Sequence, residues 1–197
     1  MIISGTSYYF FHSKGALFIM NSNSKLYTLT ISAVLCAVGI LIPLFSPVKI
    51  LIEPASFTLA SHVAIFIAMY ISPPVALFVA AGTTSGFFLA GFPIVIVFRA
   101  ATHMVFAGIG SYVLKSRPEI LNSIYKASIF SFLIALVHSI CEILVVIPFY
   151  FGGVQQNSFF FSVLLLVGVG TVVHSMVDFQ IAYLVWKPVK KAIAVKA

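Results

Sequence analysis

Residues 92–106 read F-P-I-V-I-V-F-R-A-A-T-H-M-V-F, an apolar run that is interrupted by Arg99 and His103. A guanidinium stays charged at any pH that a protein meets, so its place in such a segment requires a partner or a ligand. The run is apolar enough to belong to a membrane-spanning helix. The composition of the remaining chain decides whether it does.

The composition of the 197-residue chain identifies an integral membrane protein. Charged residues make up 8% of the sequence and hydrophobic residues 61%, and the mean hydropathy is +1.16. A soluble domain carries about 25% charged residues, so this chain has too few polar residues to cover a surface in water. The net charge of +7 indicates basic loops on one side of a membrane rather than a nucleic-acid partner.

Hydropathy and the Pro and Gly residues at segment ends predict an all-α bundle of six transmembrane helices. A spanning helix needs about 20 mainly apolar residues, and the chain divides into six such runs at turn-forming residues. The expected spans are residues 27–45, 58–72, 74–90, 93–114, 127–151 and 159–185.

The basic residues predict that both termini are cytoplasmic. With six spans the two termini share one side of the membrane, and the loops of that side hold most of the positive charge, whereas the opposite loops hold Lys49 beside Glu53. Positive charge marks the cytoplasmic side. The basic residues of that side are Lys25, Lys115, Arg117, Lys126, Lys187, Lys190, Lys191 and Lys196.

Three regions follow from this division of the chain. Residues 1–19 are expected to be an N-terminal extension or an over-called start, because Met20 and the polar N-S-N-S-K after it form a more natural beginning. Residues 20–190 form the six-helix membrane domain, and residues 191–197 a basic cytoplasmic tail. The first outer loop, residues 46–57, is semi-apolar and is expected to fold over the bundle as a lid.

The last three spans each carry two polar residues at i, i+4, and therefore on one helix face. A charged residue at the centre of a membrane costs about 2.5–3.5 kcal/mol on insertion scales, so such residues persist where they pair with one another or bind something. The pairs are Arg99 with His103, His138 with Glu142, and His174 with Asp178.

These pairs give two interpretations. In one they form a substrate site, in which Arg99 and Glu142 share a depth in the outer half of the membrane because their helices run in opposite directions. In the other they form an internal ion-pair network that fixes helix packing. For Asp178, and for His62, which stands alone on the second span, the structural role is the expected one. The predicted substrate-binding residues are Arg99, His103, His138, Glu142 and His174.

The first span contains a small-xxx-small pair, Ala33 and Ala37, with Gly39 close by. Small residues allow helices to approach closely in lipid. The pair serves packing within this chain or docking of another protein, and the sequence pattern alone leaves both open.

Several enzyme signatures are absent from the sequence. There is no phosphate-binding G-x-x-x-x-G-K-[ST] loop, no H-E-x-x-H and no G-x-S-x-G motif. Cys36 and Cys141 lie in apolar runs without the spacing of a metal site. We therefore expect neither an enzyme nor a resident cofactor or metal.

The chain resembles the S-components, the substrate-binding membrane subunits, of energy-coupling factor (ECF) vitamin transporters. The resemblance covers about residues 20–190 and rests on six spans, a long first outer loop and the A-x-x-x-A of Ala33 and Ala37. The stretches E-P-A-S-F-T-L-A-S-H-V-A-I-F-I-A-M (53–69) and G-F-P-I-V-I-V-F-R-A (91–100) are most similar to the niacin-specific branch.

This resemblance implies uptake of a water-soluble vitamin through the cell membrane. The S-component binds the vitamin from outside, and a separate transmembrane coupling protein and a pair of ATPase subunits, which use the ATP, complete the importer. The docking face for the coupling protein corresponds to Ala33 and Ala37. With niacin (nicotinate) as substrate, Arg99 would take the carboxylate, and the stacking candidates are Phe98, Phe106 and Tyr150.

Other functions stay open at this stage. Pantothenate or another carboxylate vitamin would also suit Arg99. A divalent transition-metal transporter would use the histidines with Glu142 and Asp178 as ligands, although Arg99 beside them opposes a cation. His174 and Asp178 resemble the His–Asp pair of some intramembrane proteases, but the paired glutamates that those proteases need are absent from this sequence. A sensor or assembly factor without ATPase partners is the remaining alternative.

Overall fold

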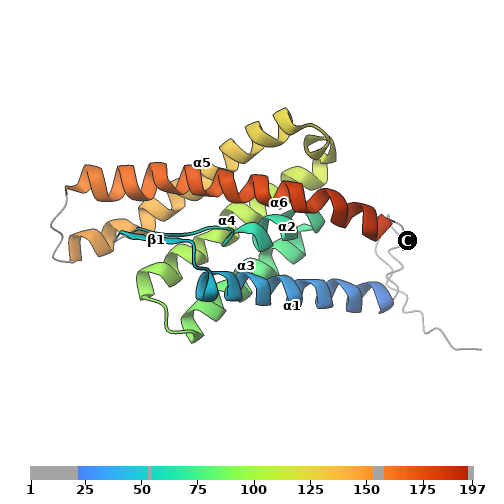
Figure 1. Cartoon of the computed structure of the whole chain (residues 1–197), viewed down its shortest axis with the longest axis horizontal. Coiled ribbons are helices and arrows are strands. Elements are labelled where there is room, and N and C mark those ends of the chain that lie inside the picture. The colour runs from blue at the N-terminus through green and yellow to red at the C-terminus, as the bar shows by residue number, and fades with distance from the viewer. Residues whose placement is uncertain (1–21, 53–54, 153–157, 195–197) are drawn as a thin grey trace, which may run out of the picture.

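The computed structural model describes residues 22–52, 55–152 and 158–194 and is a helical bundle with one short hairpin (Figure 1). The elements in chain order are α1 (Ser22–Phe45), β1 (Lys49–Ile52), β2 (Ala55–Thr58), α2 (Val63–Ile71), α3 (Pro73–Leu89), α4 (Ile94–Ser116), the 3₁₀ helix η1 (Pro118–Asn122), α5 (Ile124–Gly152), the π-helix η2 (Phe160–Val169) and α6 (Gly170–Ala194).

Four helices are long and apolar enough to cross a membrane: Lys25–Phe45, Ile94–Ser116, Ile124–Gly152 and Phe160–Lys190. The last of these joins η2 and α6 into one helix. Together they make the chain a multi-pass membrane protein. Four of the six predicted spans are therefore confirmed as long apolar helices, and α3, Pro73–Leu89, is a shorter apolar helix.

The predicted second span, residues 58–72, is wrong in its first third. Residues 55–58 form a strand that pairs antiparallel with Lys49–Ile52, and α2 begins only at Val63. Between them Ala60 has a φ of +68°, a left-handed conformation that cannot continue a helix of L-residues. The nine residues of α2 span about 14 Å, less than half the thickness of a bilayer core.

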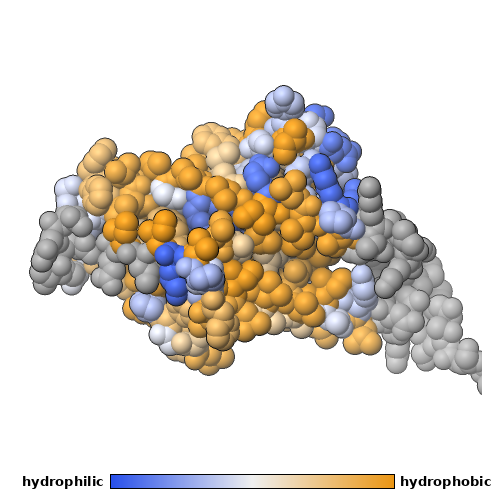
Figure 2. Space-filling view, in the orientation of Figure 1, coloured by the Kyte–Doolittle hydropathy of each residue, from blue (hydrophilic) through white to orange (hydrophobic). Residues whose placement is uncertain are grey.

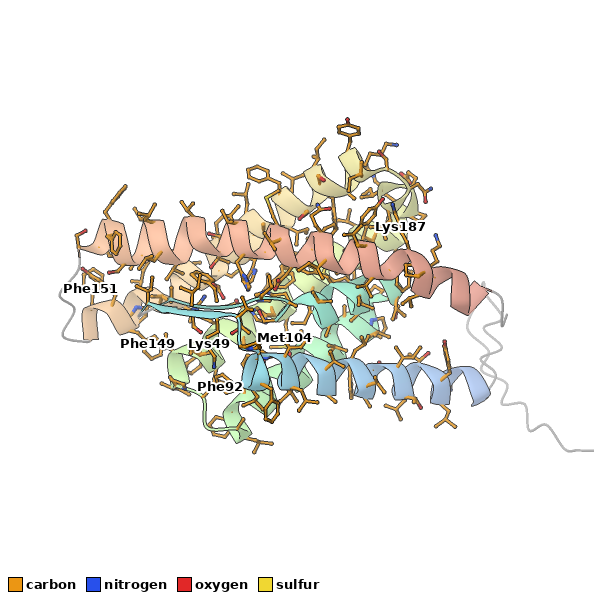
Figure 3. All side chains as sticks on the ribbon, viewed as in Figure 1. Lys49, Phe92, Met104, Phe149, Phe151 and Lys187 are labelled. Carbon is orange, nitrogen blue, oxygen red and sulfur yellow. The ribbon has the colours of Figure 1, made fainter. Side chains whose placement is uncertain are left out.

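Both described ends of the chain lie at the same end of the bundle. α1, in blue, begins where α6, in red, finishes, and the hairpin lies toward the opposite end (Figure 1). Lys187 on α6 marks the first end, and Phe149 and Phe151 lie toward the other (Figure 3). The arrangement agrees with an even number of crossings, and the cytoplasmic location of the termini stays a prediction. Residues 1–21 and 195–197 lie outside the described residues.

The outer surface of the bundle is apolar, as a lipid-facing surface is. Large hydrophobic side chains are exposed along the long helices, among them Leu29 and Val34 on α1 and Leu144 on α5. Hydrophobic residues, in orange, cover most of the face seen in Figure 2. In a protein of this composition the hydrocarbon of the membrane covers them.

α1 packs on α3 through glycines. A Cβ added at Gly39 would lie 2.5 Å from Cγ2 of Thr83, and one at Gly86 would lie 2.2 Å from Cδ1 of Ile40. These contacts require that the two backbones approach closely. In contrast, Ala33 and Ala37 are exposed, so this small-residue pair does not serve packing between the described helices.

We predict that Gly39→Leu lowers the free energy of unfolding by about 1–3 kcal/mol through overpacking. Thr83 cannot rotate away freely, because its hydroxyl donates to the carbonyls of Val79 and Ala80. The melting temperature of the detergent-purified protein measures the effect. Ala37→Leu, two residues away on the exposed face, is the control and should leave it unchanged; equal melting temperatures for both variants would contradict the α1–α3 packing.

Candidate functional site

A cavity lies beneath the hairpin and between the helices. Its wall receives residues from α1, β2 and α2 through α6, including Ser56 and Thr58 of the hairpin and Thr171 of α6. All five predicted substrate-binding residues line this one cavity: Arg99, His103, His138, Glu142 and His174. The polar faces of α4, α5 and α6 therefore meet.

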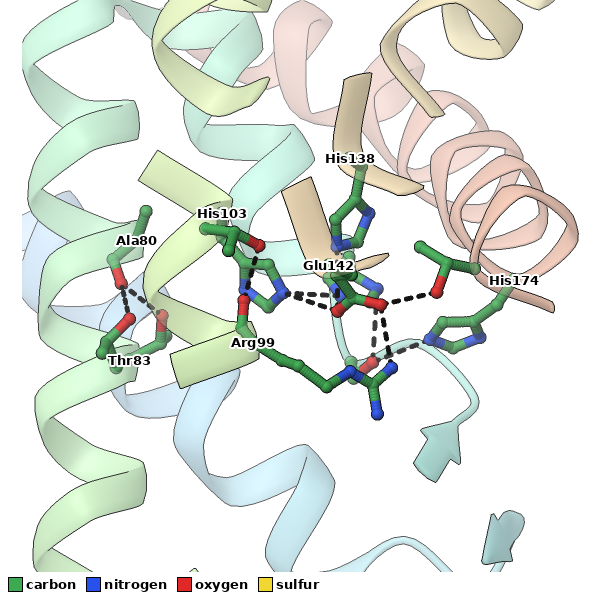
Figure 4. A network of polar contacts seen from close by, with 12 residues as sticks. Ala80, Thr83, Arg99, His103, His138, Glu142 and His174 are labelled. Carbon is green, nitrogen blue, oxygen red and sulfur yellow. Dashed lines mark hydrogen bonds and ion pairs between the residues drawn. The ribbon is translucent and has the colours of Figure 1, made fainter. Parts of the chain in front are cut away.

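The charged pair of the cavity is Arg99 on α4 with Glu142 on α5. Nη2 of Arg99 donates to Oε2 of Glu142 over 2.9 Å, and Oγ1 of Thr171 donates to the same oxygen over 2.5 Å. Both charged side chains are buried, with 5% and 2% of their surfaces exposed. The predicted common depth of these two residues is confirmed, and Figure 4 shows how the pair faces the histidines.

Four histidine rings gather beside this pair, and His62 is at their centre. Its ring centroid lies 4.6 Å from that of His103, 4.9 Å from that of His138 and 4.9 Å from that of His174. The Nε2 atoms of His62 and His103 are 3.2 Å apart. His62, expected from the sequence to be a lone structural residue, is therefore the contact that links the histidines of three other helices.

Asp178 on α6 holds the segment that carries His62. Oδ1 accepts the backbone N–H of Ala60 over 2.7 Å, and Oδ2 accepts the backbone N–H of His62 over 2.9 Å. Nδ1 of His62 lies 3.0 Å from the same Oδ2. Lys187, the cation nearest in sequence, instead lies over the ring of Tyr183. Asp178 thus has the expected structural role, and in addition it orients the ring of His62.

Comparison with known proteins identifies a relative of this chain. No family model matches it, and no solved structure matches it. The niacin transporter NiaX of Lactococcus lactis subsp. cremoris (strain MG1363) is 44% identical over 162 residues, which are 81% of this chain and 72% of NiaX. The chain belongs to the NiaX family of ECF S-components. The predicted resemblance and the prediction that the chain is not an enzyme are confirmed by this relationship.

The aromatic neighbours of this NiaX-family cavity differ from the predicted ones. The described lining includes none of the predicted stacking residues Phe98, Phe106 and Tyr150. Phe98 is half exposed, and Tyr150 packs against Phe151 and Phe159. Phe106 is buried behind the cavity with its ring 4.5 Å from that of His138.

The phenylalanines that line the cavity in the described part of the chain are Phe87 on α3 and Phe92 just before α4, and sequence reasoning missed both. Phe57, on strand β2, lies beside the cavity without being among its described lining residues. Its ring centroid lies 5.8 Å from Cζ of Arg99 and 5.4 Å from the ring of His174. A Cβ added at Gly170 would lie 2.7 Å from its ring, so a glycine on α6 makes room for it.

A double-mutant cycle tests the buried pair of this NiaX-family protein. We predict that Arg99→Met and Glu142→Met each lower the free energy of unfolding by about 3–5 kcal/mol, because each leaves an uncompensated buried charge. The double variant should lose less than the sum of the two, since neither charge remains. Denaturation in detergent measures all three, and additive losses would contradict the pairing.

Proposed function

We propose that the chain is the substrate-capturing subunit of a niacin importer, which binds nicotinate from outside the cell. Its relative NiaX is named a niacin transporter. The observation that carries the proposal is a buried arginine, Arg99, in a cavity beneath the hairpin that joins the first two helices. A carboxylate ligand is the anion that such a fork of N–H donors suits.

The proposed pose follows from the charges and rings of the cavity. Nicotinate is a planar pyridine ring whose carboxylate is attached at the carbon meta to the ring nitrogen. Arg99 takes the carboxylate, and the ring nitrogen faces the histidines. Phe87 and Phe92, which line the cavity, supply an aromatic wall, and Phe57 supports Arg99 and His174 from beside the cavity. His103, His138, Glu142 and His174 complete the proposed substrate-binding set.

Pantothenate is the alternative substrate within the same class. Its carboxylate also suits Arg99, but its hydroxyl and amide groups need donors and acceptors along a longer molecule. A cationic cargo suits the cavity less, since Arg99 would repel it. A titration with nicotinate and pantothenate side by side separates these substrates.

The proposed partners are a transmembrane coupling protein and a pair of ATPase subunits. Ala33 and Ala37 lie on the exposed face of α1, where small side chains allow another helix to approach closely. The proposed orientation places both termini in the cytoplasm, beside the ATPases, in agreement with the positive-inside rule. Uptake then needs the partners, whereas vitamin binding needs this chain alone.

We predict that Arg99→Ala abolishes nicotinate binding and that Arg99→Lys restores little of it, because an ammonium cannot reproduce the bidentate contact of a guanidinium. Calorimetric titration of the purified protein measures the affinity, and its melting temperature shows whether the variant is folded. Arg117→Ala removes the other arginine of the chain, at the end of α4, and is the matched control. Normal affinity in a folded Arg99→Ala protein would remove Arg99 from the site.

We predict that Ala33→Leu and Ala37→Leu leave nicotinate binding intact but stop uptake, because larger side chains prevent close docking of the coupling protein. Uptake of radiolabelled nicotinate by cells that express the complete importer measures transport. Ala81→Leu, on the exposed face of α3, adds the same side chain away from the docking face and should not change uptake. Unchanged uptake in the α1 variants would count against the docking role.

A further inference from the structure

The histidines of the cavity exceed what a carboxylate site requires. Arg99 accounts for the carboxylate, and one donor or acceptor accounts for a ring nitrogen, yet four imidazoles converge. His62, His103 and His138 are buried, each with 6% or less of its surface exposed. One nitrogen from each lies within 4.8 Å of the others. The inference that follows from them rests on the proposed function and deepens it.

The spacing of these three rings is that of ligands around one metal ion. A zinc ion binds imidazole nitrogen at about 2.0–2.1 Å, so two nitrogens on a tetrahedral ion lie about 3.3 Å apart. Nε2 of His62 and Nε2 of His103 are 3.2 Å apart. The ring centroids of the three histidines lie 4.6 to 4.9 Å apart, close to the spacing of about 5 Å that a tetrahedral ion imposes on bound imidazoles.

Asp178 orients His62 in the manner of a carboxylate behind a metal ligand. A ligating histidine donates its second ring N–H to a carboxylate or carbonyl, which fixes the tautomer. Nδ1 of His62 lies 3.0 Å from Oδ2 of Asp178, so the lone pair of Nε2 faces His103 and His138. Asp178 itself accepts hydrogen bonds from the backbone N–H groups of Ala60 and His62. We therefore assign it the role of orienting His62 rather than that of a direct metal ligand.

His138 is a fully buried imidazole with few polar contacts. It is 0% exposed, and its Nε2 lies 3.3 Å from Oε1 of Glu142. Its Nδ1 has no hydrogen-bond partner among the described residues. A buried polar atom without a partner is costly, and an imidazole that binds a cation through one nitrogen while the other faces a carboxylate would be satisfied at both.

The charges of the cavity favour a divalent cation. Among the described residues of this cluster, Arg99 and Glu142 cancel and Asp178 leaves one negative charge when the histidines are neutral. Nicotinate adds a second negative charge inside a membrane bundle, where uncompensated charge is expensive. The repulsion expected between Arg99 and a cation is offset, because Glu142 contacts Arg99 through Oε2 and faces His138 through Oε1.

We propose that His62, His103 and His138 bind one divalent transition-metal ion of the Zn²⁺ type, and that the pyridine nitrogen of nicotinate takes its open fourth position while the carboxylate meets Arg99. Three histidines with one open position form a known type of zinc site, and a pyridine nitrogen is a ligand of the same kind as imidazole. The metal is a resident part of the substrate site and binds the ring nitrogen of the substrate. A site that recognises the carboxylate alone could not distinguish a pyridine ring from a benzene ring.

The first experiment titrates the full-length, detergent-purified protein, stripped with a chelator, with Zn²⁺ and with Co²⁺. One ion should bind per chain, and bound Co²⁺ should give the visible spectrum of a four-coordinate site that changes when nicotinate is added. The absence of stoichiometric binding of either ion would overturn the proposal.

The second experiment compares nicotinate with benzoate, which keeps the carboxylate and lacks the ring nitrogen. Removal of the metal should weaken nicotinate binding at least 30-fold and leave the weak binding of benzoate unchanged. Equal nicotinate affinity with metal and with chelator would overturn the metal site and leave niacin capture standing. Failure of nicotinate to bind in either state would overturn the proposed function, while the metal titration would still report on the site itself.

Variants identify the ligands. His62→Asn and His138→Asn should each weaken Zn²⁺ binding at least 100-fold. The melting temperature shows whether each variant is folded. If a variant does not fold, the Co²⁺ spectrum of the wild-type protein still tests the metal site. Ser139→Ala is the matched control, since Ser139 follows His138 on α5, donates to the carbonyl of Gly168 and is not among the described lining residues of the cavity; it should change the affinity less than threefold. A loss of less than threefold in either histidine variant would overturn this set of ligands.

Discussion

The contact on which the hairpin and the cavity of this protein depend is made by one carboxylate, that of Asp178. It accepts the backbone N–H groups of Ala60 and His62 and touches the imidazole of His62. Irregular backbone at membrane depth is tolerated only where protein groups satisfy it. Because Asp178 supplies those groups, the chain can leave helical geometry at Ala60, place a hairpin over the bundle and still begin α2 at Val63. The cavity beneath the hairpin is a consequence of this arrangement.

The parts of the site that the sequence predicts are those fixed by helix geometry. Residues at i, i+4 share a face whatever surrounds the helix, so the polar faces of α4, α5 and α6 were visible in the order of residues. The alternating direction of the helices then placed Arg99 and Glu142 at one depth, and their bond of 2.9 Å confirms it. The spacing of the polar residues and the lengths of the spans are therefore enough to predict which helix faces are polar and which residues share a depth, without knowledge of the fold.

The parts that escaped prediction depend on contacts between distant segments. Residues 58–62 adjoin the apolar run 63–71 and read as the start of its helix, but their departure from helical geometry is fixed by Asp178, more than 100 positions later. His62 has no charged residue and no second histidine at helical spacing, so nothing local shows that it meets three other histidines. Phe57 lies beside Arg99 and His174 because a glycine on α6 leaves room for its ring. Local patterns cannot encode such contacts, since each partner looks ordinary by itself.

The joined helix of η2 and α6 has a mechanical consequence. Its 31 residues from Phe160 to Lys190 measure about 46 Å, whereas the hydrocarbon core of a bilayer is about 30 Å thick. A helix of this excess length tilts or projects into water. It contacts the hairpin at Gly170, a third of the way along, and carries basic residues at its far end. The part from Gly170 to Lys190 measures about 30 Å and acts as a lever: a rotation of about 5° at the hairpin contact displaces the far end by about 2.6 Å.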